Sequence, residues 1–80
     1  MIQIKPLQYG KKTAVIANIH GALKYDHING NLFGEVALFT ESQELCEVFA
    51  FKLDKEFTDT WVDDATVLPA ALEKLEIEKA

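Results

Sequence analysis

The chain has 80 residues, of which 49% are hydrophobic and 26% are charged. This length predicts one domain over residues 1–80, and so short a chain buries only about 60% of the surface that its unfolded form exposes. A deep, enclosed catalytic cleft is therefore not expected. The composition also excludes a disordered tail, a collagen-like rod and a disulfide scaffold.

The charges are divided unevenly along the chain. Residues 1–25 hold four Lys and no acid, whereas residues 26–80 hold thirteen acids against four Lys, which gives a formal net charge of −5. Arg is absent, which removes the side chain that most often binds phosphate and guanine through two parallel hydrogen bonds. We therefore expect no nucleic-acid partner, and a basic end with an acidic end suits head-to-tail contact between copies.

The sequence predicts neither export nor membrane insertion. Its start lacks the apolar stretch of about seven residues that a signal peptide needs, and the chain has no run of about 18 apolar residues that could span a membrane. The single cysteine, Cys46, fits a reducing compartment and is interpreted as a small buried or half-buried strand residue.

Two strands are predicted at the start of the chain. Residues 2–8 alternate between apolar and polar before and after Pro6, which suits a short strand at a sheet edge. Residues 13–25 form a longer run rich in β-branched residues, in which Gly21 predicts a bulge or a bend.

Two further strands follow in the middle of the chain. Asn29-Gly30 lies between apolar runs and predicts a hairpin with a type I′ turn, because both residues tolerate a positive φ. The hairpin leads to a strand over residues 32–40, and a polar turn over 41–44 leads to another over 45–53. The predicted sheet is an antiparallel meander.

A short helix is expected next, over residues 55–61. Asp54 can act as its N-cap, and Phe57 and Trp61 would share one face at a spacing of four residues. This aromatic pair is interpreted as part of the core.

The last element is a helix over residues 66–76, where leucine and alanine side chains form one apolar stripe. Pro69 is tolerated only in the first turn, so the helix should begin at Thr66 or Val67. Residues 76–80 are expected to form a frayed end or a short extension. The whole sequence predicts an α+β fold: an antiparallel β-meander of three to four strands with two short C-terminal helices packed on one face. The predicted core comprises Val15, Ile19, Leu23, Val36, Leu38, Phe49, Phe51, Phe57, Trp61, Leu68, Leu72 and Leu75.

Both faces of this sheet carry apolar residues, although two short helices can cover only one. One interpretation is that the first strand and its loops close the second face into a small barrel. The other is that the second face contacts further chains, because monomeric proteins rarely leave a large apolar patch in water. On the second interpretation the interface residues are Ile16, His20, Phe33, Phe39 and Val48.

The sequence offers no recognisable reactive site, and we expect no enzyme activity, no metal ion and no cofactor. His20 and His27 are predicted in a strand and in a loop, where they would not converge on one ion. There is no glycine-rich phosphate loop, no nucleophile elbow and no CxxC pair. Helix capping and a solvated connection explain four closely spaced aspartates better than a calcium loop does: Asp54, Asp59, Asp63 and Asp64.

About half of the chain resembles small phage virion-associated structural proteins. The similar parts are residues 51–64, where a strand meets a short helix with an aromatic residue, a Trp and an Asp-Asp step, and residues 67–75. The opening Ile4-Lys5-Pro6-Leu7, followed by Tyr9-Gly10-Lys11, is also similar. Pro69 in the final helix departs from the pattern. The resemblance implies a structural protein of a tailed-phage particle, assembled in many copies, with no catalytic residues to transfer.

Two functions follow from these observations. The first is a non-enzymatic structural or assembly protein that self-associates or binds other virion proteins, with the virion, assembled in the host cytoplasm, as its location. The alternative is a small acidic inhibitor that mimics nucleic acid and occupies a basic site on a host protein. Its surrogate phosphate array would be Glu35, Glu41, Glu44, Glu47, Asp59, Asp63 and Asp64.

Overall fold

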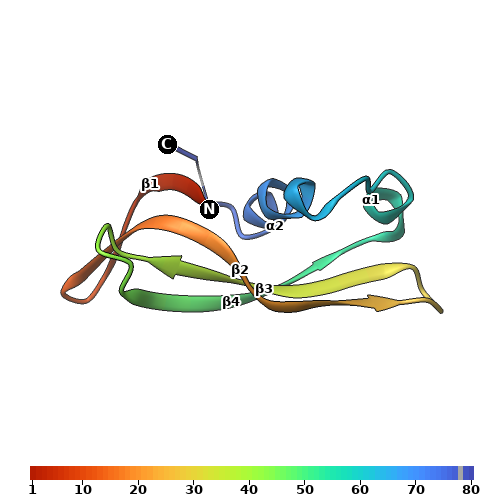
Figure 1. Cartoon of the computed structure of the whole chain (residues 1–80), viewed down its shortest axis with the longest axis horizontal. Helices are drawn as coiled ribbons and strands as arrows, with labels where there is room; N and C mark the ends of the chain where they lie inside the picture. Colours follow the sequence, from red (N-terminus) through yellow and green to blue (C-terminus); the bar gives the residue numbers. More distant parts are fainter. Residues whose placement is uncertain (78) are drawn as a thin grey trace.

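The computed structural model describes residues 1–77 and 79–80. Within them, four antiparallel strands lie in the order in which they occur in the sequence, and two short helices and a single 3-10 turn follow. This is the predicted α+β meander, with the strand over residues 2–8 as its fourth member (Figure 1). The elements are β1 (Ile2–Tyr9), β2 (Lys12–Asp26), β3 (Asn31–Phe39), β4 (Leu45–Leu53), α1 (Lys55–Asp59), η1 (Asp64–Thr66) and α2 (Val67–Lys74).

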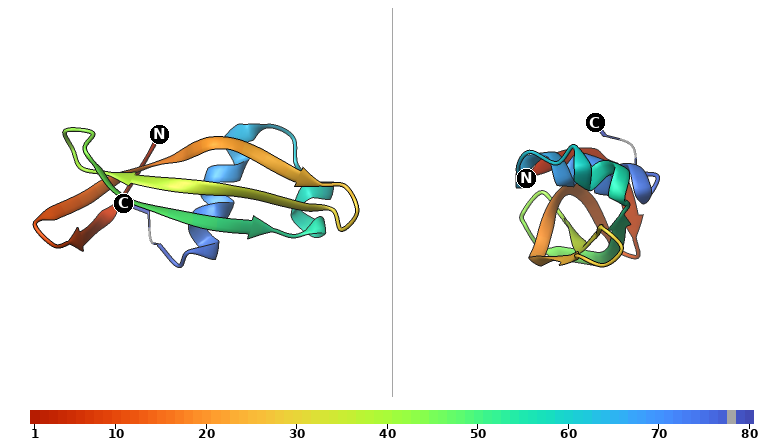
Figure 2. Two further views of the ribbon diagram at one scale, coloured as in Figure 1. Left: turned by 90° about the horizontal axis from the view of Figure 1, so that it is seen from below. Right: turned by 90° about the vertical axis from the view of Figure 1, so that its right-hand side faces the viewer.

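The sheet is strongly curled along its length, and the helices lie across its concave side (Figure 2). The curl brings the β1–β2 end round to β4, where the rings of Tyr9 and Phe49 are 6.4 Å apart and the Lys12 Nζ donates to the Leu45 carbonyl at 3.3 Å. β1 and the helices thus lie on the concave side, so β1 does not close the second face as the barrel interpretation expected, and the convex side faces outward.

The register shifts once in each of the three strand pairs, including the β3–β4 pair between Leu38 and Phe39, and bulges of this kind bend and twist a sheet. The β2–β3 register shifts between His20 and Lys24, where Gly21 has φ +72°, so the predicted bulge is confirmed. The β1–β2 register shifts between Gln3 and Leu7, around Pro6.

The β1 irregularity also accounts for a wrong core prediction. Ala14 and Ala17 are both fully buried, so strict alternation is broken between them. Val15, which lies opposite the shift in β1, falls outside the core cluster of the described residues. Strict alternation had placed Val15 on the same face as Ala17, and the extra residues in β1 remove that relation.

The β2–β3 hairpin is confirmed, but the predicted type I′ turn is wrong. The loop has four residues, 27–30, and is closed by the Gly30 amide, which donates to the Asp26 carbonyl at 2.7 Å. Gly30 has φ +73°, whereas a type I′ turn would need a positive φ at Asn29 as well. The Asp26 carboxylate favours the wider loop because it accepts the amides of Ile28 and Asn29 at 3.0 and 3.3 Å.

Asp54 caps α1 as predicted, accepting the Phe57 amide at 3.1 Å. The helix ends at Asp59, however, so Trp61 lies beyond it and the expected extent to residue 61 is wrong. The Thr60 hydroxyl donates to the Phe57 carbonyl at 2.9 Å, and the Trp61 indole donates forward to the Asp63 carbonyl at 2.7 Å. These bonds favour a turn over a further helical residue.

The α2 helix begins at Val67, as Pro69 requires, but it ends at Lys74 rather than at residue 76. The end is a Schellman motif: the Ile77 amide donates to the Leu72 carbonyl and the Glu76 amide to the Glu73 carbonyl, both at 3.1 Å. Glu76 occupies its left-handed position with φ +58°. In the expected terminal extension, Lys79 pairs with Ile4 of β1, and residue 78 lies outside the described residues.

The core lies between the concave side of the sheet and α2. Apart from Val15, every predicted core residue is buried in it or packs against it. The buried positions that the prediction omitted are small residues or lie near element ends, namely Ile4, Ala14, Ala17, Leu32, Leu53, Val67 and Ala71.

Candidate functional site: the outer face of the sheet

The convex side of the sheet is the largest surface with a recurring side-chain pattern. In an antiparallel sheet, directly paired residues point to the same side. The pairs Ile16–Phe39 and Ala37–Val48 therefore share one side, and the core cluster contains none of these four. We call this side the outer face; its residues are Gln3, Ile16, Asn18, His20, Lys24, Phe33, Glu35, Ala37, Phe39, Leu45, Val48, Ala50 and Lys52.

The structure brings all of the predicted interface residues onto the outer face. Ile16, Phe39 and Val48 are half-buried, His20 is exposed opposite Glu35, and Phe33 is 38% exposed. Neither α1 nor α2 packs on this side of the sheet (Figure 1).

Successive rows across the outer face change in chemistry. At the β2–β3 hairpin end, Phe33 lies between Lys24 and Lys52. The next row pairs His20 with Glu35. The rows nearer the other end are mainly apolar, and Ala37 within them is only 1% exposed because larger neighbours flank it. The face is thus cationic at one end and apolar at the other.

A small hollow of about 190 Å³ adjoins the apolar end of the outer face. It is lined by Met1, Asn18, Phe39 and Gln43. Met1 is 73% exposed there. Met1 therefore adds apolar surface beside Phe39, and the residues that line the hollow include no acid–base pair.

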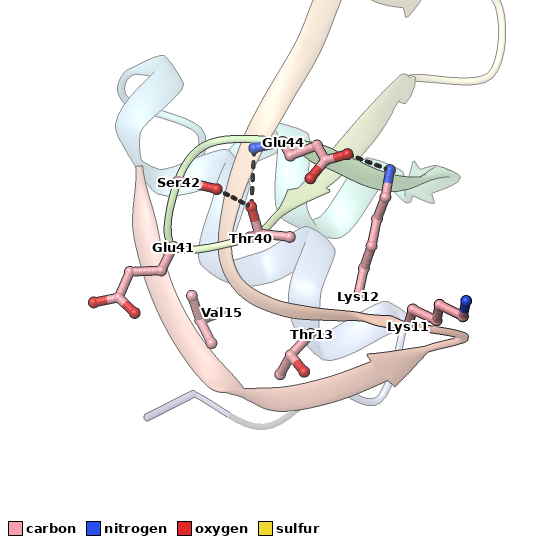
Figure 3. Close-up of a pocket in the computed structure, with 8 residues that line it drawn as sticks. All are labelled: Lys11, Lys12, Thr13, Val15, Thr40, Glu41, Ser42 and Glu44. Carbon is pink, nitrogen blue, oxygen red and sulfur yellow. Dashed lines mark hydrogen bonds and ion pairs between the residues drawn. The ribbon is translucent and has the colours of Figure 1, made fainter.

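A larger, open hollow of about 600 Å³ lies between the β1–β2 turn and the β3–β4 turn (Figure 3). Lys12 reaches across it to Glu44, with Nζ 2.9 Å from Oε1. The Thr40 Oγ1 accepts the Glu44 amide at 3.0 Å and lies 3.0 Å from the Ser42 Oγ. These polar groups are engaged with one another, and no His lines the hollow to activate either hydroxyl.

The Lys12–Glu44 pair also corrects the expected division of charge. Lys12 belongs to the basic first part of the sequence and Glu44 to the acidic remainder, yet folding places them in contact. The molecule therefore has no simple basic end and acidic end, because the meander brings the two turns together at one end of its 42 Å long axis.

The acidic residues of the nucleic-acid-mimic hypothesis lie at both ends of the molecule. Glu41 and Glu44 belong to the β3–β4 turn, whereas Asp59 ends α1 at the opposite end (Figure 1). Asp59 is paired with Lys55, whose Nζ lies 2.7 Å from Oδ2. Within residues 1–77 and 79–80, no group of three or more His, Cys, Asp or Glu side chains is placed to hold a metal ion.

Two groups with shifted pKa values have structural causes. Burial raises the pKa of the Tyr9 phenol, and the nearby Glu47 and Cys46 add to the increase. The side-chain hydrogen bond from Asn29, with Nδ2 at 2.8 Å, lowers the pKa of the Asp26 carboxyl. Cys46 itself is half-buried and free, as expected.

Sequence reasoning missed one exposed apolar side chain that the structure makes prominent. Val62 follows α1 and is 85% exposed, next to Asp63 and Asp64. The available signal was an isolated valine beside two acids in a predicted connection, which periodicity cannot assign to a face.

In the described part of the chain, no helix is both long and apolar enough to cross a membrane. Comparison of the sequence and the structure with protein-family models, curated proteins and solved structures finds no match.

Proposed function

We propose that this protein is a non-enzymatic assembly protein that associates with further copies of itself through the outer face. The observation that carries the proposal is the set of apolar rows containing Ile16, Phe39 and Val48 on the side of the sheet opposite α1 and α2. Monomeric proteins rarely expose a contiguous apolar patch, and where one is exposed it often marks an interaction site.

The residue types on the outer face suit an interface. Aromatic side chains supply most of the energy at protein contacts, and Phe33 and Phe39 lie at the two ends of the same strand. They sit on a paired sheet rather than on a loop, so little conformational entropy is lost when a partner binds. Polar side chains such as His20 and Glu35 border the apolar rows, as in the polar rim of known interfaces.

The setting that we propose is a phage particle, in which the chain would also contact other virion proteins. This part of the proposal is supported by the resemblance of residues 51–64 and 67–75 to small virion-associated proteins. A particle component needs a surface that repeats identically in every copy, and a rigid sheet face meets that need.

Replacement of Phe39 by Asp tests the proposal. A carboxylate buried in an interface without a partner costs several kcal/mol, so Phe39→Asp should dissociate the assembly. Ile28→Asp is the matched control, because Ile28 is 93% exposed in the 27–30 loop, at the end of β3 opposite to Phe39. Sedimentation over a range of concentrations reports the association of each variant, and thermal melting reports its fold.

We expect Phe39→Asp to sediment as a monomer with a cooperative melt, and Ile28→Asp to associate like the unmodified protein. Loss of the melt in Phe39→Asp would place this side chain in the core instead. A monomer at every concentration for the unmodified protein would refute self-association.

A further inference from the structure

The cationic end of the outer face has a defined arrangement. Lys24 and Lys52 are the two cross-strand neighbours of Phe33, one from β2 and one from β4. All three side chains are exposed, and neither lysine forms an ion pair with another of the described residues. The row therefore presents an aromatic ring between two positive charges, with Glu35 in the adjoining row.

A surface of opposite charge lies on the connection between α1 and α2. It comprises Val62, Asp63 and Asp64, and we call it the acidic step. Val62 is 85% exposed and both aspartates are exposed. The step thus presents one apolar side chain followed by two negative charges. Its apolar side chain matches the aromatic ring of the row, and its negative charges match the two positive charges of the row.

The acidic step is held in place by hydrogen bonds. The Asp63 carbonyl accepts the Trp61 indole N–H at 2.7 Å, the Thr66 hydroxyl at 2.8 Å and the Thr66 amide at 3.3 Å. The Trp61 ring packs against the core. Val62 is therefore presented from an ordered backbone, and its binding would require little additional ordering.

The two surfaces lie on different sides of the sheet within one molecule. The connection that carries the acidic step belongs to the helix layer above the concave side of the sheet, whereas the row lies on the convex side (Figure 1). Face-to-face contact between the step and the row therefore needs another copy.

We infer that self-association is head-to-tail, with the acidic step of one copy docked on the Lys24–Phe33–Lys52 row of the next. This inference rests on the proposed self-association through the outer face and names the second surface involved. Because the two surfaces differ, the contact is heterologous, and its repetition produces a ring or an open stack rather than a closed dimer. Sedimentation should show a series of masses that rises with concentration.

Charge reversal on each surface tests the inference. One variant carries Lys24→Glu and Lys52→Glu, and the other carries Asp63→Lys and Asp64→Lys. In each variant like charges would face one another, which is strongly unfavourable at an interface, so we expect association to weaken on the order of 100-fold. A control with Lys11→Glu and Lys74→Glu makes the same change in net charge as the first variant, at residues that belong to neither surface.

A mixture of the two charge-reversed variants provides the decisive measurement. The glutamates of the first then face the lysines of the second, while the native lysines of the second face the native aspartates of the first. We expect the mixture to associate although each variant alone is monomeric. Exposed charges are screened over about 8 Å at physiological ionic strength and over a shorter distance at higher salt, so high salt should weaken this association.

The outcomes separate this inference from the proposed function. If the charge-reversed variants associate as strongly as the control, or if folded variants fail to associate when mixed, the head-to-tail contact is wrong while self-association stands. If the unmodified protein is monomeric at every concentration, both are refuted. Cooperative thermal melting of each variant establishes that it is folded.

Discussion

Gly34 is the position in the sheet where one added methyl group should have the clearest effect. A Cβ atom there would lie 2.7 Å from the Leu23 Cδ2 and 2.7 Å from the Phe51 Cζ. Phe51 is only 6% exposed within the core, so its ring cannot move without disturbing its neighbours, whereas the half-buried Leu23 has more freedom to adjust. The absence of a side chain at Gly34 is therefore required by packing on the concave side.

Two opposing effects decide the stability of Gly34→Ala. Replacement of glycine by alanine reduces the entropy of the unfolded chain, which stabilises the fold by about 0.4–1 kcal/mol where the backbone is compatible. Overpacking of a well-packed core destabilises it by about 1–3 kcal/mol. Because the contacts at 2.7 Å involve a buried ring, we expect overpacking to dominate, with a net loss of about 1–2 kcal/mol.

Thermal melting followed by circular dichroism is a suitable assay. At roughly 4–8 °C per kcal/mol for a chain of this size, Gly34→Ala should lower Tm by roughly 4–16 °C. In a Leu23→Ala background the same change should cost less, because only the contacts with Phe51 remain. A Gly34→Ala variant that melts at or above the temperature of the unmodified protein would refute the packing argument.

Two further predictions concern local conformation and charge. Glu76 has φ +58° at the end of α2, a conformation that glycine adopts without strain, so Glu76→Gly should stabilise the fold by about 0.5–1 kcal/mol. Glu73→Gly within the helix should destabilise the fold instead. Urea denaturation of both variants measures the contrast, and equal effects would contradict it. The Asp26 pKa should lie below its ordinary range because Asn29 hydrogen-bonds the ionised carboxylate. The ionised carboxylate therefore stabilises the fold at pH values above the Asp26 pKa of the unfolded chain, and this stabilisation is lost as the pH falls through the lower pKa of the folded chain. Carboxyl titration by NMR measures this directly, and an ordinary or raised pKa would argue against the loop bonds.

Much of the fold could be predicted because local signals agree with the tertiary structure. The strand over residues 45–53 was predicted with its observed bounds, and Asp54 and Pro69 marked the starts of the two helices through capping and ring geometry. The outer face could also be predicted, because β3 alternates without interruption and its even and odd residues separate cleanly onto two sides.

The errors occur where an interaction beyond the local pattern decides the structure. The 27–30 loop depends on how the Asp26 carboxylate binds two amides, which the Asn-Gly signal does not specify. Val15 leaves the core because of extra residues in the neighbouring strand, and no feature of its own segment indicates that. The Lys12–Glu44 contact depends on the curl of the whole sheet, so charge along the sequence could not predict charge on the surface.

The order β1-β2-β3-β4 has a consequence for the rate of folding. Every strand in this sheet pairs with its neighbour in the sequence, so the pairings close short loops and lose little chain entropy. Pairing between sequence neighbours keeps the contact order below that of a sheet with crossover connections, which favours faster folding and shortens the time during which unpaired strands are open to aggregation. The bridge between Ile4 and Lys79 is different, since it joins the two ends of the chain and closes a far longer loop, so we expect it to form after the hairpins and α2. Formation of this bridge therefore marks the completion of folding, when the ends of a chain built from local pairings finally meet.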